Sequence, residues 1–463
     1  MSDTDSDDNA PRTFKRPKLE ESVKGLYLES VNRSVLDFDF EKLCSVSLNN
    51  INVYACLCCG RYFQGRGPQS NAYFHSLNED HHVFIHLETL KVVYALPDGY
   101  EVNDSSLDDI KYQIQPTYTM EQVKQLDKKL LISNDLHGKQ YLPGFVGLNN
   151  IKHNDGINSL MHAMAHIQPL RNYFLLNYNF KSEIGIKRIV KSLVSRFGML
   201  VRKIWNPKAF KVHVSPHEFI QEVSNASKKR FRLGVQSEDP IEVLSWFLNT
   251  LHKGLGGSRK ANSSIIYDTF QGVLKIDTQE RNELELTATK FTSQMVPFLF
   301  LSLDLPVMPL FSDEADKTTI PQVSLDALLA KYNGKKATEL EAVRKRFSIE
   351  SLPKYLVFCV KRFSKNNFAE EKNSTIINYP IKNLDMAPYL SKTNSDLSTK
   401  YDLLANIIYE GNEKKSEGCY KVHLVHPSAE QWFQIQDLFV DEIMAQMIIL
   451  SESCIQIWKQ QDI

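Results

Sequence analysis

The sequence predicts an α+β protein in which a small metal-binding domain precedes a long region of mixed helices and strands. Three of its seven cysteines fall within four consecutive positions, and histidines follow them. Runs of β-branched and aromatic residues, such as Val53–Cys56 and Lys91–Tyr94, are typical of strands. From Ile184 to Trp205 the apolar residues recur with the spacing of an amphipathic helix. A chain of 463 residues has room for about two or three domains.

The composition is that of an ordinary globular protein, with 42% hydrophobic and 24% charged residues. Lysine plus arginine equals aspartate plus glutamate, 55 each, which argues against a general attraction to nucleic acid or membrane. The most apolar stretch, Met295–Phe311, contains Asp304 and three prolines, so we expect no membrane helix and no membrane partner. The odd, clustered cysteines favour a reduced protein with one metal site over a disulfide framework.

Changes in composition divide the chain into three parts. Residues 1–24 are polar without apolar periodicity and are predicted to be a disordered tail. Its basic cluster, Lys15–Lys18, is either a nuclear import signal or a solvated run of charge. We assign residues 25–125 to the metal-binding domain and residues 138–463 to the α/β domain, with a polar, helix-prone connector around 116–138.

The metal site is predicted from Cys56-x2-Cys59 followed by His75 and His81. Two thiolates three positions apart bind one metal at a tight turn, and two imidazoles complete a tetrahedron that selects zinc. We therefore expect one structural zinc ion bound by these four residues. His82 adjoins His81, so the identity of the fourth ligand stays open.

A DNA-reading zinc finger is the competing interpretation of this cluster. That motif expects about 12 residues between the second cysteine and the first histidine, and 15 are found here. Two glycines and a proline within Gln64–Pro68 disfavour a recognition helix at this place. We do not expect DNA reading.

The segment also resembles the UBP-type zinc finger, and four of its parts carry the resemblance: Cys56–Phe63, Gly65–Gly67, His75 and His81. The resemblance implies the zinc ligands. Some members of that family grip the C-terminal glycines of ubiquitin, and ubiquitin binding by this chain is left open.

A second resemblance spans roughly 320 residues and implies a papain-like ubiquitin-specific-protease fold. Gly147–Leu160 is similar to the cysteine box of that family, G-L-x-N-x-G-N-T-C-x-x-N-S, with Asn150 at the oxyanion-stabilising asparagine. Further family motifs are matched in the same order by Asp239–Leu244, Leu352–Phe363, Tyr379–Asp385, Tyr401–Tyr420 and Trp432–Asp437.

The catalytic positions of that family are changed in this chain. Asp155 stands at the nucleophilic cysteine, Cys419 at the general-base histidine, and Gln436 at the residue that orients the histidine. A carboxylate is a weak nucleophile toward an amide, and a thiol cannot accept and return a proton as an imidazole does. We therefore predict a degenerate protease fold that is not an enzyme.

Three other sites come into question from the sequence or from the resemblance. His162 and His166 have the spacing of a zinc-protease helix, but alanine replaces the glutamate base. A site built from Asp155, Cys419 and His423 is conceivable. No cysteine lies between Phe270 and Leu352, so the second zinc that many ubiquitin-specific proteases carry is not expected.

The predicted helix at Ile184–Trp205 has a basic face, made of Lys187, Arg188, Lys191, Arg196, Arg202 and Lys203. It is either a solvated surface or a docking face for RNA phosphate or an acidic protein.

The combination of one finger, one protease-like domain without its triad and a basic tail resembles the splicing factors associated with the U4/U6.U5 tri-snRNP. Asp155, Gly418–Tyr420 and Ile455–Lys459 carry this closer resemblance. It implies a nuclear role in assembling or maintaining the tri-snRNP through contacts with spliceosomal proteins, with RNA contact left open. The alternatives are a module that binds ubiquitin or a ubiquitin-like protein, and a residual deubiquitinase.

Overall fold

The computed structural model describes residues 27–90, 93–177, 186–232, 239–280, 291–307, 320–340, 343–365, 370–391, 398–411 and 418–462. The chain forms two compact units. Unit 1 comprises the residues up to Phe38 together with Lys42–Ile114, and unit 2 comprises Asp39–Glu41 and Gln115–Ile463. The predicted tail, including its basic cluster, lies outside the described residues.

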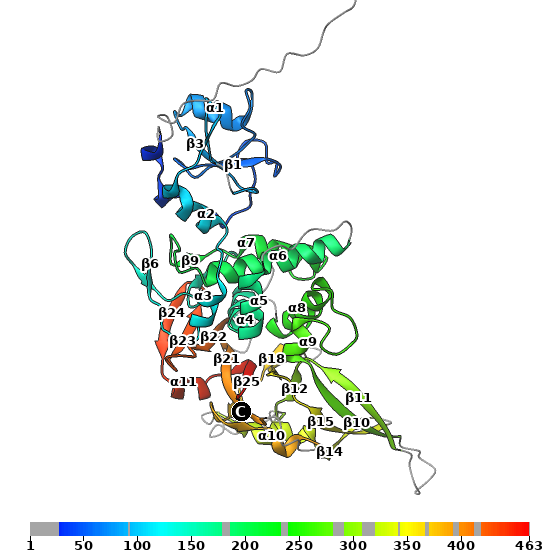
Figure 1. The fold of residues 1–463 in the computed structure, drawn as a ribbon. Coiled ribbons are helices and arrows are strands. Elements are labelled where there is room, and N and C mark those ends of the chain that lie inside the picture. Colours follow the sequence, from blue (N-terminus) through cyan, green and yellow to red (C-terminus); the bar gives the residue numbers. More distant parts are fainter. Residues whose placement is uncertain are drawn as a thin grey trace, which may run out of the picture. The chain divides into compact units, whose positions relative to one another are not determined.

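Unit 1 is built on a five-stranded antiparallel sheet with the strand order β2-β1-β3-β4-β5 (Figure 1). The predicted strand Val53–Cys56 is confirmed as β1, and its four residues are all buried. The other elements are β2 (Tyr62–Gln64), α1 (Asn71–Asn78), β3 (Val83–His86), β4 (Val93–Ala95), β5 (Tyr100–Val102), α2 (Asp108–Ile114) and the short 3-10 helices Leu28–Ser30, Arg33–Val35 and Ser105–Leu107.

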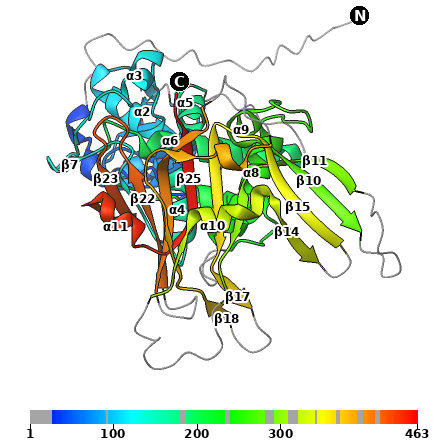
Figure 2. The same cartoon turned by 90° about the horizontal axis from the view of Figure 1, so that it is seen from below.

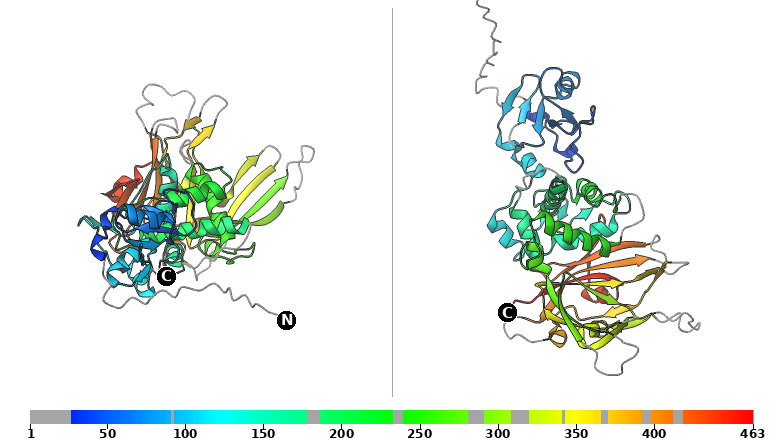
Figure 3. Two further views of the ribbon diagram at one scale, coloured as in Figure 1. Left: turned by 90° about the horizontal axis from the view of Figure 1, so that it is seen from above. Right: turned by 90° about the vertical axis from the view of Figure 1, so that its right-hand side faces the viewer.

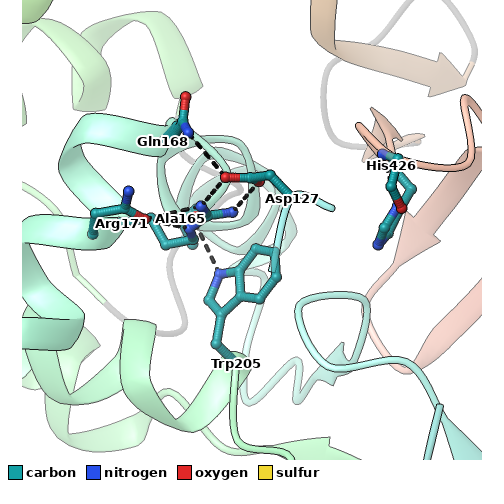
Figure 4. A network of polar contacts seen from close by, with 8 residues as sticks. Asp127, Ala165, Gln168, Arg171, Trp205 and His426 are labelled. Carbon is teal, nitrogen blue, oxygen red and sulfur yellow. Dashed lines mark hydrogen bonds and ion pairs between the residues drawn. The ribbon is translucent and has the colours of Figure 1, made fainter. Parts of the chain in front are cut away.

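The boundary between the units lies earlier than the sequence indicated, because the connector packs into unit 2. Thr119 caps α3 (Met120–Gln125), and Val123 and Leu126 enter the main core of unit 2. Just after the helix, both carboxylate oxygens of Asp127 accept hydrogen bonds from Arg171, at 2.8 and 2.6 Å (Figure 4). Two apolar residues in a polar stretch gave too weak a periodicity to predict this packing.

The helical part of unit 2 consists of α4 (Asp155–Ala165), α5 (Gln168–Leu176), α6 (Ile186–Ile204), α7 (His217–Ala226), α8 (Pro240–Gly254) and α9 (Ile265–Phe270). All eleven residues of α4 are buried, so this helix runs through the core. The long amphipathic helix predicted near Ile184–Trp205 is confirmed as α6. The later part of its apolar stripe, which includes Leu193, Phe197 and Val201, is buried, whereas Ile189 near the start of the helix is 44% exposed.

The helices pack on the central sheet, whose main strand order is β12-β16-β25-β21-β22-β23-β24 (Figures 1 and 2). Its strands are β12 (Leu301–Asp304), β16 (Tyr355–Lys361), β20 (Leu384–Asp385, beside β21), β21 (Lys400–Gly411), β22 (Gly418–Val425), β23 (Trp432–Gln436), β24 (Phe439–Ile443) and β25 (Ser453–Gln460). Successive residues of β16 enter two different core clusters, because side chains alternate between the faces of a sheet. The sheet is therefore covered on both sides there.

A second, four-stranded sheet extends from the central sheet in the order β11-β10-β15-β14 (Figure 3). It consists of β10 (Gly272–Glu280), β11 (Phe291–Phe298), β14 (Asn333–Leu340) and β15 (Val343–Ser351). Smaller elements of unit 2 are β6 (Ser133–Asn134), β7 (Gln140–Tyr141), β8 (Gly147–Leu148), β9 (His213–Val214), β13 (Gln322–Ser324), α10 (Leu325–Leu329), β17 (Phe363–Lys365), β18 (Glu370–Lys372), β19 (Ile376–Asn378), α11 (Ala445–Ile449) and the 3-10 helices Ala330–Tyr332 and Ala387–Tyr389.

The α+β class is confirmed by these sheets and helices. Among the described helices, none is both long and apolar enough to cross a bilayer.

Candidate functional site

The metal-binding residues predicted in unit 1 converge in space. One ligand atom each from Cys56, Cys59, His75 and His81 lies within 4.8 Å of all the others. A tetrahedral zinc ion holds its nitrogen and sulfur ligands about 3.3–3.8 Å apart. The His75 Nε2 atom is 3.4 Å from the Cys59 sulfur and 3.0 Å from His81 Nδ1, so the set fits around one such ion.

The local turn after β1 places the two thiols together. Cys56 ends β1, and the Gly60 N–H donates to the Cys56 carbonyl at 2.9 Å. Gly60 has a φ of 76°, and a Cβ atom there would lie 2.4 Å from the Val35 carbonyl oxygen. Only glycine fits this turn, which curls the chain so that Cys59 comes back beside Cys56.

The partners of His82 bear on the open question of the fourth ligand. Its Nδ1 lies 2.7 Å from the Leu96 carbonyl oxygen, and its Nε2 lies 2.8 Å from Asp80. Both ring nitrogens are thus engaged away from the cluster, whereas His81 belongs to it. The geometry favours His81 as the fourth ligand.

In unit 2, Asp155 occupies the start of α4, the place the cysteine-box resemblance gave to the nucleophile. Its side chain is buried, and its Oδ2 accepts a 2.7 Å hydrogen bond from the backbone N–H of Tyr420 on β22. A carboxylate at a helix N-terminus is stabilised by the helix dipole. Asp155 therefore joins the helical part to the central sheet.

Cys419 and Gln436 lie together on neighbouring strands, as their positions in the family motifs implied. The Gln436 amide donates to the Cys419 sulfur at 3.4 Å. Burial raises the pKa of the Cys419 thiol, the charge of Lys421 lowers it, and the charge of Asp155 adds to the rise, so that the net pKa is above its ordinary value. A thiol with a raised pKa is mostly protonated at neutral pH and is a poor nucleophile.

Asp437 was not identified from the sequence, although it organises the site. Its carboxylate accepts hydrogen bonds from the side-chain amides of Asn150, at 3.0 Å, and Asn158, at 3.1 Å. Asn150 matches the oxyanion-stabilising asparagine of the resembling family, yet here its amide is held by an acid. A Cβ atom on Gly147 would lie 2.7 Å from the Leu438 Cα, so the two segments touch closely.

The alternative site with His423 is not assembled. His423 lies four residues after Cys419 on β22, which is about 13 Å along a strand. Its Nε2 contacts Gln434 at 3.2 Å, and burial lowers its pKa to about 4. A neutral imidazole at that distance cannot serve as a base for the Cys419 thiol.

The two histidines of α4 belong to no group of three or more candidate metal ligands among the described residues. Burial lowers the pKa of both His162 and His166 to about 3, so they are neutral core residues. His166 Nδ1 lies 2.8 Å from the His162 carbonyl oxygen. Within the described part of the chain, the four residues of unit 1 are the one group with the spacing of metal ligands.

Three of the six cations on the basic face of α6 have partners inside unit 2. Arg202 is buried and donates to the carbonyls of Phe174 and Asn177. Lys203 pairs with Asp39 at 2.8 Å, and Arg196 pairs with Glu218 at 2.9 Å. These three cations stabilise the fold, and the side chains of Lys187 and Arg188 lie outside the described residues, so the geometry gives no support to a docking face here.

Asp39 is a buried acid that sequence reasoning missed. It accepts hydrogen bonds from Lys203 and the Ser215 N–H, and Lys211 lies 2.8 Å away. Burial alone would raise the pKa of Asp39, but the charges of Lys203 and Lys211 outweigh burial and lower the pKa to about 2. No local pattern could reveal it, because Lys203 is 164 residues away in the sequence.

We expect the free energy of unfolding to fall at low pH because of Asp39. Since its pKa is lower in the folded than in the unfolded chain, its contribution is complete above pH 4 and is lost as the pH falls through 2. At pH 7 that contribution is about 2.5 kcal/mol. Urea unfolding at pH 7 and at pH 3 measures the difference in the free energy of unfolding between the wild type and Asp39→Asn. This difference should be smaller at pH 3 than at pH 7, and the same difference at both pH values would contradict the lowered pKa of Asp39.

Replacing Asp155 is expected to destabilise unit 2. Asp155→Ala leaves the buried Tyr420 N–H without its acceptor, a cost of about 1–3 kcal/mol. Asp155→Asn keeps an acceptor oxygen and should lose less. Glu121→Ala, an exposed acid in the first turn of α3, controls for the helix dipole and should cost under about 1 kcal/mol. Chemical denaturation tests this, and an Asp155→Ala protein as stable as the wild type would refute it.

The architecture is that of a zinc-finger unit joined to a protease-like unit, in which Asp155 begins the buried helix α4. Residues 146–458 match the family model described as "Ubiquitin carboxyl-terminal hydrolase". Residues 44–107 match the family model described as "Zn-finger in ubiquitin-hydrolases and other protein". The chain belongs to the ubiquitin carboxyl-terminal hydrolase family. This membership confirms the fold expected from the motifs.

Three relatives resemble the chain over nearly its whole length. "Ubiquitin carboxyl-terminal hydrolase 39" of Homo sapiens is 50% identical, over 94% of this chain and 80% of its own. "Probable mRNA-splicing protein ubp10" of Schizosaccharomyces pombe is 48% identical, over 94% and 88%. "Pre-mRNA-splicing factor SAD1" of Saccharomyces cerevisiae is 31% identical, over 98% and 99%.

A solved structure shows the same architecture. "Crystal structure of an essential yeast splicing factor" superimposes with a TM-score of 0.77 and 29% identity, covering 94% of this chain and all of that one. The closer resemblance to splicing factors is thereby confirmed.

Proposed function

We propose that the protein is a non-catalytic nuclear pre-mRNA splicing factor that helps assemble or maintain the U4/U6.U5 tri-snRNP through protein–protein contacts. Two of its relatives are named as splicing proteins, and a similar structure is titled as a splicing factor. In this role the protease fold is a rigid body that binds spliceosomal proteins, and unit 1 carries one zinc ion held by Cys56, Cys59, His75 and His81.

The hydrogen bond from the Tyr420 N–H to Asp155 is the observation that carries the non-catalytic part of the proposal. The site offers an acid where the reaction needs a thiolate, and a protonated thiol where it needs an imidazole. The amide of Asn150 is held by Asp437, so the donor for a developing oxyanion is also engaged. Losing one triad member already costs orders of magnitude in rate, and here all three positions differ from the family pattern.

A ubiquitin probe that traps active-site thiols tests this inactivity. We expect no labelling of Cys419 in the native protein after prolonged incubation, whereas an active family member labels fully under the same conditions. Labelling that disappears in Cys419→Ala would establish a residual deubiquitinase. Saturable binding of unmodified ubiquitin, measured by titration, would instead favour the ubiquitin-binding alternative.

The splicing role is tested in a nuclear extract depleted of this protein. Adding the protein back should restore splicing and the tri-snRNP peak on a glycerol gradient. The Cys419→Ala variant should restore both equally, because the thiol takes no part in the role. If the wild-type protein restores splicing while the tri-snRNP peak never changes, the role lies at another step.

A further inference from the structure

Strand β24 (Phe439–Ile443) is the last strand of the central sheet (Figure 1). It forms a hairpin with β23, in which Gln436 and Phe439 are paired across a two-residue turn. Such a turn is closed by a hydrogen-bonded pair, and these pairs alternate along an antiparallel ladder. The backbone N–H and C=O groups of Val440 and Glu442 therefore point away from β23, along the edge of the sheet.

This edge lacks three of the features that protect native edge strands, namely lysine, proline and a β-bulge. Its charged side chains, Asp441 and Glu442, are both acidic and therefore discourage pairing with an acidic strand rather than with a basic one. β24 contains neither lysine nor proline, and its register with β23 runs without a shift over five residue pairs. The strand is thus a regular template for one more strand.

Large exposed apolar side chains occur on β24 and in the residues that flank it in the sequence. They lie within thirteen consecutive residues that include β24 and α11, and their exposed fractions run from 47% to 70%: Leu438, Phe439, Met444, Met447 and Leu450. Single exposed apolar residues are normal, but a local group of them marks an interaction site. Methionine adapts its shape to different partners.

The charged residues of β24 and of the sequence around it are acidic, although lysines from other segments pair with two of these acids, Glu430 and Glu452. No lysine or arginine occurs between Val422 and Trp458. Asp441 and Glu442 are exposed on β24 itself. An extended segment that carries basic side chains would be complementary in charge, and one that carries acidic side chains would be repelled.

We propose that the β24 edge, meaning Phe439–Ile443 with the exposed side chains of Leu438, Met444, Met447 and Leu450, binds an extended segment of a partner protein. The segment adds a strand beside β24, and its side chains alternate between apolar and basic. Strand addition supplies affinity through main-chain hydrogen bonds, and alternate side chains supply specificity. The inference rests on the proposed role as a protein-binding body and identifies a surface that performs it.

Labelled octapeptides test the proposal on the whole protein by fluorescence anisotropy. We expect saturable binding of an alternating valine–lysine peptide, with affinity at least tenfold above that of the valine–glutamate peptide. A valine–lysine peptide with N-methylated main-chain nitrogens should also bind at least tenfold more weakly, because it cannot pair. Hydrogen exchange of the Val440 and Glu442 amides should slow on binding of the first peptide.

Variants of the edge locate the binding. Glu442→Pro removes a donor that faces outward, where proline is tolerated, and should weaken binding at least tenfold. Asp441→Lys changes charge alone and should weaken the valine–lysine peptide at least fivefold, so the test holds even if the proline variant does not fold. Met444→Ser should weaken binding severalfold. Met295→Ser, which changes a similarly exposed methionine on β11, is the control and should leave binding unchanged.

Equal affinity for the lysine and glutamate peptides, or unchanged affinity in Asp441→Lys and Met444→Ser, would overturn the proposal. Dimerisation of the protein that is lost in Asp441→Lys would assign the edge to a second copy and would also overturn it. Failure of peptide binding while add-back still restores splicing would reject this surface and leave the proposed function intact.

Discussion

Loss of the metal ion is expected to unfold unit 1. Zinc contributes about 10–16 kcal/mol to the folding of small zinc fingers, which is comparable to the whole free energy of unfolding of a typical native domain, about 5–15 kcal/mol. The cluster of buried apolar residues next to the site is small, with Tyr54, Cys56, Phe63, Ala72, Phe84 and Leu96. This cluster by itself is too small to hold the four ligands together without the ion.

Elemental analysis should give one zinc per chain, and strong chelators should abolish the ordered amide signals of unit 1. A matched pair of variants tests the ligand set: Cys59→Ser should lose the zinc, whereas Cys58→Ser should keep it, because Cys58 is not in the converging group. His82→Ala should likewise keep the zinc. Two zinc ions per chain, or zinc retained by Cys59→Ser, would refute the four-ligand assignment.

Asp127→Ala is expected to cost unit 2 about 3–5 kcal/mol, because it leaves a buried cation without its partner. The Arg171 side chain is 1% exposed, and its two hydrogen bonds to Asp127 neutralise it (Figure 4). The Gln168 amide also donates to Asp127, at 3.0 Å. The Arg171 guanidinium lies 4.7 Å from the Trp205 ring, and Trp205 donates to the Ala165 carbonyl.

Urea unfolding followed by tryptophan fluorescence measures this loss of stability. Asp268→Ala is the control, because its ion pair with Lys354 is exposed and such pairs contribute about 0–1 kcal/mol. The double variant Asp127→Leu with Arg171→Met removes both charges and should recover much of the loss, since buried ion pairs can be replaced by apolar residues. An Asp127→Ala protein no less stable than Asp268→Ala would contradict this role.

The sequence predicted those features that depend on residues close together in the chain. The spacing of Cys56 and Cys59, the strand at Val53–Cys56 and the stripe of α6 each depend on residues a few positions apart. The order of the family motifs, with Asp155 inside the first of them, was also readable, because each motif is a contiguous run. These patterns determined the class of fold and the expectation of inactivity.

Only the tertiary structure showed which polar groups meet across long separations. Asn150 and Asp437 are 287 residues apart, and Asp39 and Lys203 are 164 apart. Periodicity and motif spacing describe neighbours within a few turns of helix or strand, so they carry no signal for such pairs. The basic face of α6 illustrates the consequence: its charges were visible in the sequence, but their partners were not.

The same limit applied to His81 and His82, and to the connector. Adjacent histidines are equivalent in a ligand pattern, and only the fold turns His82 toward Leu96 and Asp80. The connector is polar in sequence because only two of its side chains, Val123 and Leu126, enter the core, and its ion pair with Arg171 involves a residue far away in the chain. The sequence thus predicted the main elements and, through its motifs, the importance of Asp155, Cys419 and Gln436. The tertiary structure decided which distant charges and amides they contact, because burial brings those groups together.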